Sequence, residues 1–73
     1  MPTITTRALL RALARHGFRR VRQRGSHVVM ERKDWRGTRQ VVVPVHRGDV
    51  KPGTLGNILR LAGMTFQELL EVA

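Results

Sequence analysis

The segment RQRGSHVVMER, residues 22–32, puts a histidine directly after a basic turn and at the start of a run of β-forming residues. The neutral imidazole of His27 could remove a proton from a substrate hydroxyl and return it later as imidazolium. Arg22 and Arg24 lie close to it in the chain and could bind a phosphate group through paired N–H donors. On spacing alone, a half-buried strand histidine with a hydrogen-bonded ring explains His27 better than catalysis does.

The other two histidines are weaker candidates for chemistry. His46 follows a predicted strand in VPVH, where it could serve as a second acid or base, although a hydrogen-bonding role in a turn is the simpler interpretation. His16 precedes Gly17 at a predicted helix end, where an imidazole interacts favourably with the helix dipole. The histidines show no HxxxH spacing, no paired acids accompany them, and the chain has no cysteine, so we expect no metal and no other cofactor.

Positive charge is the dominant feature of the composition. Fourteen Lys and Arg against five Asp and Glu give a net charge of +9, which makes a polyanion the expected partner. Seven arginines and no acid lie in residues 1–30, whereas Glu68 and Glu71 are the only charged residues in 61–73. Twelve of the fourteen basic residues are Arg, which favours bidentate phosphate contacts and base stacking. A solvated surface without a nucleic-acid partner is the alternative.

The chain is short for an enzyme with an enclosed active site. Its 73 residues predict one domain, 1–73, with a thin core. A chain of this size buries only about 60% of the surface that it exposes when unfolded. No apolar run approaches the ~20 residues that a membrane-spanning helix needs, so we expect no membrane contact. The lack of cysteine makes the cytoplasm the expected location.

Capping signals predict three helices. Thr5 can cap a first helix that runs to residue 14 or 15. Thr54 is expected to cap a second helix, for which Gly63 is the C-terminal stop. The sequence TFQE, residues 65–68, has the form of a capping box and predicts one last short helix.

Alternating and β-branched runs predict three strands, at residues 18–23, 26–32 and 38–45. Short turns are expected at 24–25 and across 33–37, so consecutive strands pair antiparallel. The expected fold class is α+β, a two-layer α-β-β-β-α arrangement in which a three-stranded antiparallel sheet has helices on one face and is free on the other. If Val28 and Met30 meet the helices, alternation turns His27 to the free face.

Two further features can be explained equally well by RNA binding and by a purely structural role. One stripe of the first predicted helix is basic, because arginines recur at Arg7, Arg11 and Arg15. Like charges at this spacing cost about 0.2–0.5 kcal/mol per pair, so a helix laid along phosphates and a set of solvated arginines explain the stripe about equally well. Trp35 lies in a predicted turn between charged residues, where it could stack on a base, anchor a partner protein or fold back on the sheet.

Three segments carry a family resemblance by their joint order and spacing: HGFRRVRQRGSH at 16–27, VVVPVH at 41–46 and KPGTLGNILRLAGMTFQELLE at 51–71. Together they resemble the HicA family of mRNA interferase toxins, whose fold is similar to the double-stranded RNA-binding domain. The resemblance covers nearly the whole chain. It departs from the family at Val28, Val29 and Met30, where polar or aromatic residues are frequent, and at Gly56, which is expected to interrupt the second helix.

The resemblance implies a metal-independent endoribonuclease that cleaves mRNA. Such a protein is the toxin of a type II toxin–antitoxin pair and has a HicB-type antitoxin as its protein partner. The resemblance makes His27 the catalytic histidine, which reverses the preference stated from spacing alone, and leaves His46 as a secondary catalytic candidate. The residues then expected to bind RNA are Arg7, Arg11, Arg15, Arg22, Arg24, Ser26 and Lys51.

Two other functions stay open at the level of sequence. A non-catalytic double-stranded RNA-binding module would hold structured RNA through shape and charge. A DNA-binding partner subunit is less favoured, because the chain shows no helix-turn-helix pattern. An antitoxin gene beside the gene for this chain would favour the toxin over both.

Overall fold

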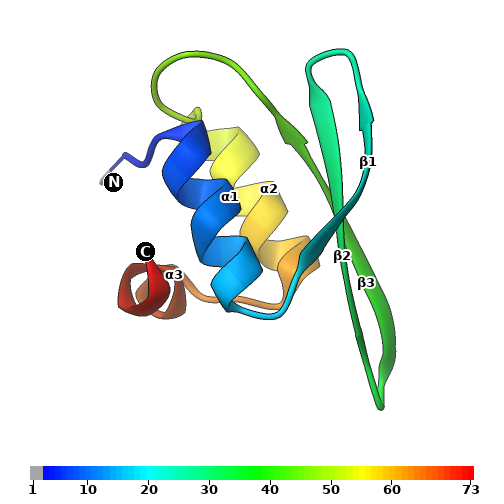
Figure 1. Ribbon diagram of the computed structural model, residues 1–73. Helices are drawn as coiled ribbons and strands as arrows, with labels where there is room; N and C mark the ends of the chain where they lie inside the picture. Colours follow the sequence, from blue (N-terminus) through cyan, green and yellow to red (C-terminus); the bar gives the residue numbers. More distant parts are fainter. Residues whose placement is uncertain (1–2) are drawn as a thin grey trace.

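The computed structural model describes residues 3–73. Its elements are, in chain order, α1 (Thr6–Arg15), β1 (Arg19–Arg24), β2 (His27–Asp34), β3 (Gly37–Pro44), α2 (Pro52–Ala62) and α3 (Phe66–Val72). The strands pair antiparallel in the order β1-β2-β3, and α1 and α2 lie on the same side of this sheet (Figure 1). No helix of residues 3–73 covers the other side. The expected α+β class, an α-β-β-β-α order with an open three-stranded sheet, is confirmed.

The core forms between the sheet and the helices. From α1 it receives Leu9, Ala12 and Leu13, which recur at helical spacing and are fully buried. The strands and α2 contribute further apolar side chains at their own periods: Val28, Met30, Val41, Val43, Leu55, Ile58, Leu59 and Ala62. Val28 and Met30 of β2 belong to this core, so the alternation of side chains along a strand turns His27, Val29 and Glu31 to the side without helices, which we call the open face.

The capping signals at α1 and α3 are confirmed. Thr5 Oγ1 accepts a hydrogen bond from the N–H of Ala8 at 3.1 Å. In α3, Thr65 Oγ1 accepts from the N–H of Glu68 at 3.0 Å, and the Glu68 carboxylate accepts from the N–H of Thr65 at 2.9 Å. This reciprocal capping box satisfies two backbone donors that a helix start otherwise leaves unpaired.

The same bonds act on the charge of Glu68. The hydrogen bond from the backbone N–H of Thr65, and then the Thr65 side chain, hold the pKa of Glu68 below its ordinary value. Coulombic interactions with His16 and Arg32 lower the pKa of Glu68 further, to a lesser extent. His16 is the C-cap residue of α1, so its predicted place at the helix end is confirmed.

Both hairpin turns differ from the predicted ones. The first consists of Gly25 and Ser26, one residue later than predicted, because its first position has a φ of +55°, which favours glycine. The second consists of Trp35 and Arg36 alone, because the pairing of β2 with β3 continues right up to it. The hairpin of β2 and β3 is therefore longer than the sequence pattern predicts.

The start of α2 also differs from the prediction. The helix begins at Pro52 with Lys51 as its N-cap, so Thr54 lies inside the helix and its predicted capping role is wrong. Proline fixes φ at a helical value and lacks the N–H that the first turn leaves unpaired, which favours it as the first residue. Gly56 does not interrupt the helix, and Gly63 ends it with a φ of +70°, as predicted.

A β-bulge in β1 changes which side chains face the helices. The register passes from Arg20 opposite Met30 to Arg22 opposite Val29, so Val21 has no partner. Residues directly opposite each other lie on the same face of a sheet, which puts Arg20 on the helix side and Arg22 on the open face. Uninterrupted alternation would have put both on the helix side. The arginines after the bulge consequently share the face of the β2 histidine.

Candidate active site

His27 is the first residue of β2 and lies on the open face. Its neighbours across the sheet are Arg24 of β1 and Pro44 of β3. The side chain is exposed, so the half-buried histidine that spacing alone favoured is wrong. An exposed imidazole on an uncovered sheet is accessible to a large substrate without rearrangement of the fold.

Two arginines of β1 flank the imidazole. Arg24 is directly opposite His27, which corresponds to a Cβ separation of about 5 Å, and Arg22 is diagonal to it at about 7–8 Å. Both are exposed, and within the described chain neither side chain has an ion-pair or hydrogen-bond partner. Arg19 shares this face because it pairs with Glu31. Arg19 was not predictable from the sequence, because the face of the sheet on which it lies depends on the register of the strands.

Backbone pairing beyond the strand ends brings His46 to the same end of the sheet. The N–H of Val45 donates to the carbonyl of Ser26 at 2.6 Å, and His46 follows directly. Its exposed ring has Nδ1 at 2.9 Å from the carbonyl oxygen of Arg47. Because a carbonyl oxygen only accepts, Nδ1 donates this bond, and Nε2 is the nitrogen left for other partners.

The N-terminal ends of α1 and α2 lie at this same end of the molecule, at the top of Figure 1. The N–H of Val50 donates to the carbonyl of Ile4 at 2.8 Å, which ties the start of α1 to the loop before α2. Arg7 lies in the first turn of α1, and Lys51 is the N-cap of α2. Both are exposed, so they add positive charge to the end of the molecule that carries His27.

The rest of the basic stripe on α1 lies further away. Arg11 is exposed one turn along the helix, and Arg15 is at the far end. The Arg15 Nη1 donates to the carbonyl of Val72 at 3.0 Å and so joins α1 to the last turn of α3. The structure therefore gathers, at one end, His27, His46, Arg7, Arg22, Arg24, Ser26 and Lys51. Arg11 and Arg15 are not part of that group.

Two other arginines contribute to the packing of the fold. Arg32 lies over the ring of Phe18, with its guanidinium carbon 5.2 Å from the centroid, and donates to the carbonyl of His16 at 3.4 Å. Arg39 donates to the carbonyl of Leu61 at 3.4 Å, at the end of α2. Arg32 of β2 and Arg39 of β3 are directly opposite each other on the helix side of the sheet, so neither faces the surface around His27.

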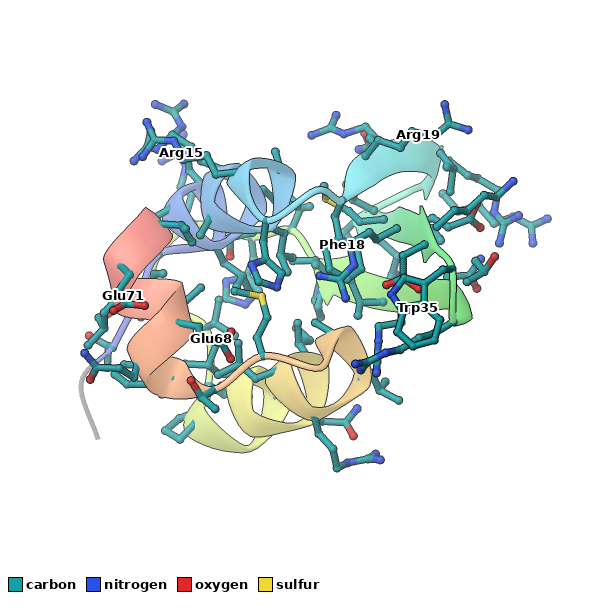
Figure 2. The ribbon with its side chains drawn as sticks, turned by 90° about the horizontal axis from the view of Figure 1, so that it is seen from below. Arg15, Phe18, Arg19, Trp35, Glu68 and Glu71 are labelled. Carbon is teal, nitrogen blue, oxygen red and sulfur yellow. The ribbon has the colours of Figure 1, made fainter. Side chains whose placement is uncertain are left out.

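The acidic residues of the chain end lie apart from the arginines of the sheet. Figure 2 shows Glu68 and Glu71 on α3, whereas Arg19 extends from the sheet on the far side of the molecule. The arginines of β1 are therefore separated in space from the two carboxylates, whereas Arg15 of α1 lies beside α3. An approaching polyanion meets the arginines of β1 without passing these carboxylates.

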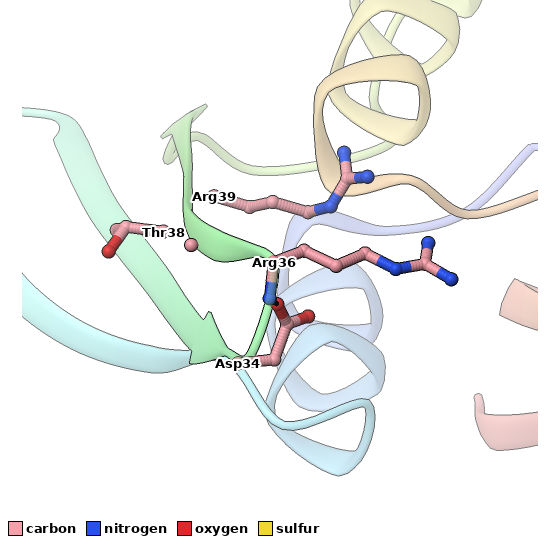
Figure 3. Close-up of a pocket in the computed structure, with 5 residues that line it drawn as sticks. Asp34, Arg36, Thr38 and Arg39 are labelled. Atoms are coloured by element: carbon pink, nitrogen blue, oxygen red, sulfur yellow. Dashed lines mark hydrogen bonds between the residues drawn. The ribbon is translucent and has the colours of Figure 1, made fainter.

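A hollow of about 200 Å³ lies at the β2–β3 turn, at the opposite end of β2 from His27 (Figure 3). Its lining consists of Asp34, Arg36, Gly37, Thr38 and Arg39. It is therefore separate from the surface that carries the histidine.

The ionisable groups beside His27 are guanidinium and imidazole groups. Within residues 3–73, no three His, Asp or Glu side chains are grouped so that they could hold a metal ion. Over the same stretch, none of the helices has both the length and the apolar character needed to cross a bilayer.

Fold and surface together define a small α+β protein, consistent with the double-stranded RNA-binding-domain-like architecture, with an exposed histidine on a basic open sheet. Over residues 6–64 the chain matches the family described as HicA toxin of bacterial toxin–antitoxin. Because the match covers most of its length, the chain belongs to the HicA toxin family, and the resemblance found in the sequence is confirmed. A search of the curated proteins gave no match. Family membership makes the chain the toxin of a toxin–antitoxin system and implies an antitoxin partner.

Proposed function

We propose that residues 1–73 act as one toxin domain, an endoribonuclease that cleaves mRNA in the cytoplasm without a metal ion and is neutralised by a HicB-type antitoxin. The observation that carries the proposal is the exposed His27 on the open face with Arg22 and Arg24 beside it. Membership of the HicA toxin family supports the toxin role. The excess of positive charge supports a nucleic-acid substrate.

RNA carries its own nucleophile, the 2′-hydroxyl, so one proton acceptor beside a bound phosphate is enough to begin cleavage. His27 removes the 2′-hydroxyl proton, the 2′-oxygen forms a bond to phosphorus, and the bond from phosphorus to the 5′-oxygen breaks. The leaving 5′-oxygen takes up a proton, either from the imidazolium of His27 or from a second acid. The products are a 2′,3′-cyclic phosphate, which water then opens, and a 5′-hydroxyl.

The flanking arginines have the charge that this reaction requires. The phosphorane-like transition state carries more negative charge on its non-bridging oxygens than the ground state does. The guanidinium groups of Arg22 and Arg24 therefore stabilise the transition state more than the bound substrate, which accelerates the chemical step.

His46 is the candidate for the second acid. Because its Nδ1 donates to the carbonyl of Arg47, the Nε2 position is the one that would deliver a proton to the leaving 5′-oxygen. The remaining residues proposed to bind RNA are Arg7, Arg11, Arg15, Ser26 and Lys51. Arg7 and Lys51 lie at the His27 end of the molecule, whereas Arg15 also holds α3 and contributes less to RNA binding.

Replacing His27 by alanine tests the proposal. The side chain is exposed on a strand, so folding survives at a stability cost of about 0.5–1 kcal/mol. Loss of a general base lowers a rate by about a hundredfold to ten-thousandfold, so RNA cleavage and growth arrest both disappear. RNA binding persists because the arginines are unchanged. Gln40→Ala, on the same face of β3, is the matched control and retains cleavage, binding and growth arrest.

A folded His27→Ala protein that cleaves RNA at the parental rate contradicts the role of His27. The alternative function, a non-catalytic double-stranded RNA-binding module, has a different signature. In that case the parental protein would bind structured RNA tightly and leave it intact, and the His27→Ala protein would bind the same RNA equally tightly.

A further inference from the structure

The β2–β3 turn presents the one tryptophan of the chain to solvent. Trp35 is 88% exposed, more than any other large apolar side chain of the described residues, so the alternative in which it folds back on the sheet is wrong. Exposed aromatic side chains of this size are typical contact residues of binding surfaces. Trp35 is not part of the site around His27, which lies at the other end of β2.

The turn holds this ring in a defined environment. Asp34 Oδ1 accepts a hydrogen bond from the N–H of Arg36 at 2.8 Å, which fixes the two-residue turn at the end of a fully paired hairpin. The guanidinium carbon of Arg36 lies 4.9 Å from the centroid of the Trp35 ring. One ring face is therefore next to a cation, and the high exposure leaves the other ring face accessible.

The surroundings of the ring are basic. Lys33 and Arg36 are exposed on either side of Trp35, and Arg39 lines the neighbouring hollow of about 200 Å³. Figure 3 shows the Arg36 and Arg39 side chains extending in the same direction. Two acids are close to this group: Asp34 bonds the turn and lies 3.6 Å from Arg32, and Glu31 lies 3.8 Å from the ammonium group of Lys33. The hollow therefore offers an anion the Arg36 guanidinium and those N–H groups of Arg39 that do not bond the carbonyl of Leu61.

This combination fits a nucleotide better than a protein side chain. Protein interfaces place their aromatic anchors in cores depleted of charge, whereas cations surround Trp35. Proteins that bind unpaired RNA stack its bases on aromatic rings and arginine planes and neutralise its phosphates with basic side chains. The turn presents both kinds of group together.

We propose that Trp35 stacks an unpaired base of the bound RNA, with Arg36 and Arg39 binding the adjacent phosphate. The inference rests on the proposed RNA substrate and specifies it further. At ~3.3 Å per residue, the eight steps from His27 to Trp35 span about 26 Å. The substrate is therefore an RNA with an unpaired nucleotide at about that distance from the cleaved bond, and short fragments that cannot reach both ends bind more weakly.

Trp35 is the only tryptophan of the chain, so stacking is observable directly. Uncleaved RNA of defined sequence, held in a single-stranded form, is titrated into the His27→Ala protein while indole fluorescence is recorded. We expect the emission to be quenched on saturation. Trp35→Ala should weaken RNA binding by about 5-fold to 150-fold, the range for one stacked base, and Trp35→Phe should restore most of the affinity.

Two controls separate stacking from general electrostatics. Neither substitution changes charge, so the slope of log affinity against log salt should stay the same. RNA of equal length that carries abasic positions throughout should bind the parental and Trp35→Ala proteins equally.

Unchanged fluorescence at RNA saturation, or parental RNA affinity of Trp35→Ala, overturns the inference. Loss of affinity for the antitoxin with RNA affinity retained also overturns it and identifies the turn as a protein contact. The catalytic proposal fails separately: a protein with intact His27 that shows quenching without cleavage refutes the ribonuclease and leaves the stacking contact standing.

Discussion

Replacing Arg22 and Arg24 together by alanine removes the two guanidinium groups nearest to His27. One unit of extra transition-state charge at ~5 Å from a guanidinium gains about 0.8 kcal/mol at the dielectric constant of water, the value suited to exposed groups. Two arginines contribute about 1.7 kcal/mol, so kcat should fall about 15-fold to 20-fold. Loss of two phosphate contacts should also reduce the slope of log affinity against log salt by about 1.4–1.8.

Single-turnover cleavage at saturating protein measures the chemical step, and filter binding at increasing salt measures the contacts. The matched control is the pair Arg20→Ala and Arg60→Ala, which removes the same charge from positions outside the open face. Because Arg20 lies on the helix side of the sheet, this control should cleave at nearly the parental rate. Equal losses of kcat in the two double variants would refute the proposed role of Arg22 and Arg24 in stabilising the transition state.

Four other outcomes follow from the structure. Gly63→Ala should lower the free energy of unfolding in urea by about 1–2 kcal/mol, because φ is +70° and the new Cβ would lie 2.8 Å from Arg39 Cζ. Gly56→Ala should raise the free energy of unfolding by about 0.5–1 kcal/mol, because the new Cβ would have no atom outside its own turn within 4 Å. The lowered pKa of Glu68 gives stability that is present above its ordinary value of 4.5 and is lost as pH falls through the lowered value. Acid unfolding curves of parental and Glu68→Gln proteins should therefore differ at neutral pH and converge below pH 4.5. An antitoxin that blocks the site sterically should protect His27 from diethyl pyrocarbonate, and a reactive His27 in a silenced complex would indicate an indirect route.

Helix caps could be predicted from the sequence where the hydrogen-bond donor and acceptor lie within one helical turn of each other. Thr5 with Ala8, and Thr65 with Glu68, form caps whose donors and acceptors are three residues apart, so the sequence predicts them without knowledge of the fold. The start of α2 could not be predicted this way, because Pro52 and Thr54 both favour a helix start and only the packed helix shows which is used.

The site depends on longer-range features that the sequence pattern does not contain. The free-face position of His27 was predictable from the burial of Val28 and Met30. The bulge at Val21 was not, because a strand of alternating arginines reads equally well in either register. The contact of Arg32 with Phe18 was not predictable from the local pattern either, since the two come together only when β1 pairs with β2.

Identification of the RNA ends after cleavage in the presence of a chelator tests the central claim most directly. One purified RNA is incubated with the parental and His27→Ala proteins, both shown to be folded and to bind it. The account predicts that the parental protein, and not the variant, yields 2′,3′-cyclic phosphate or its hydrolysed form together with 5′-hydroxyl ends, at a rate that the chelator leaves unchanged. Cleavage that stops with chelator, products with 5′-phosphate ends, or cutting by His27→Ala at the parental rate would contradict it.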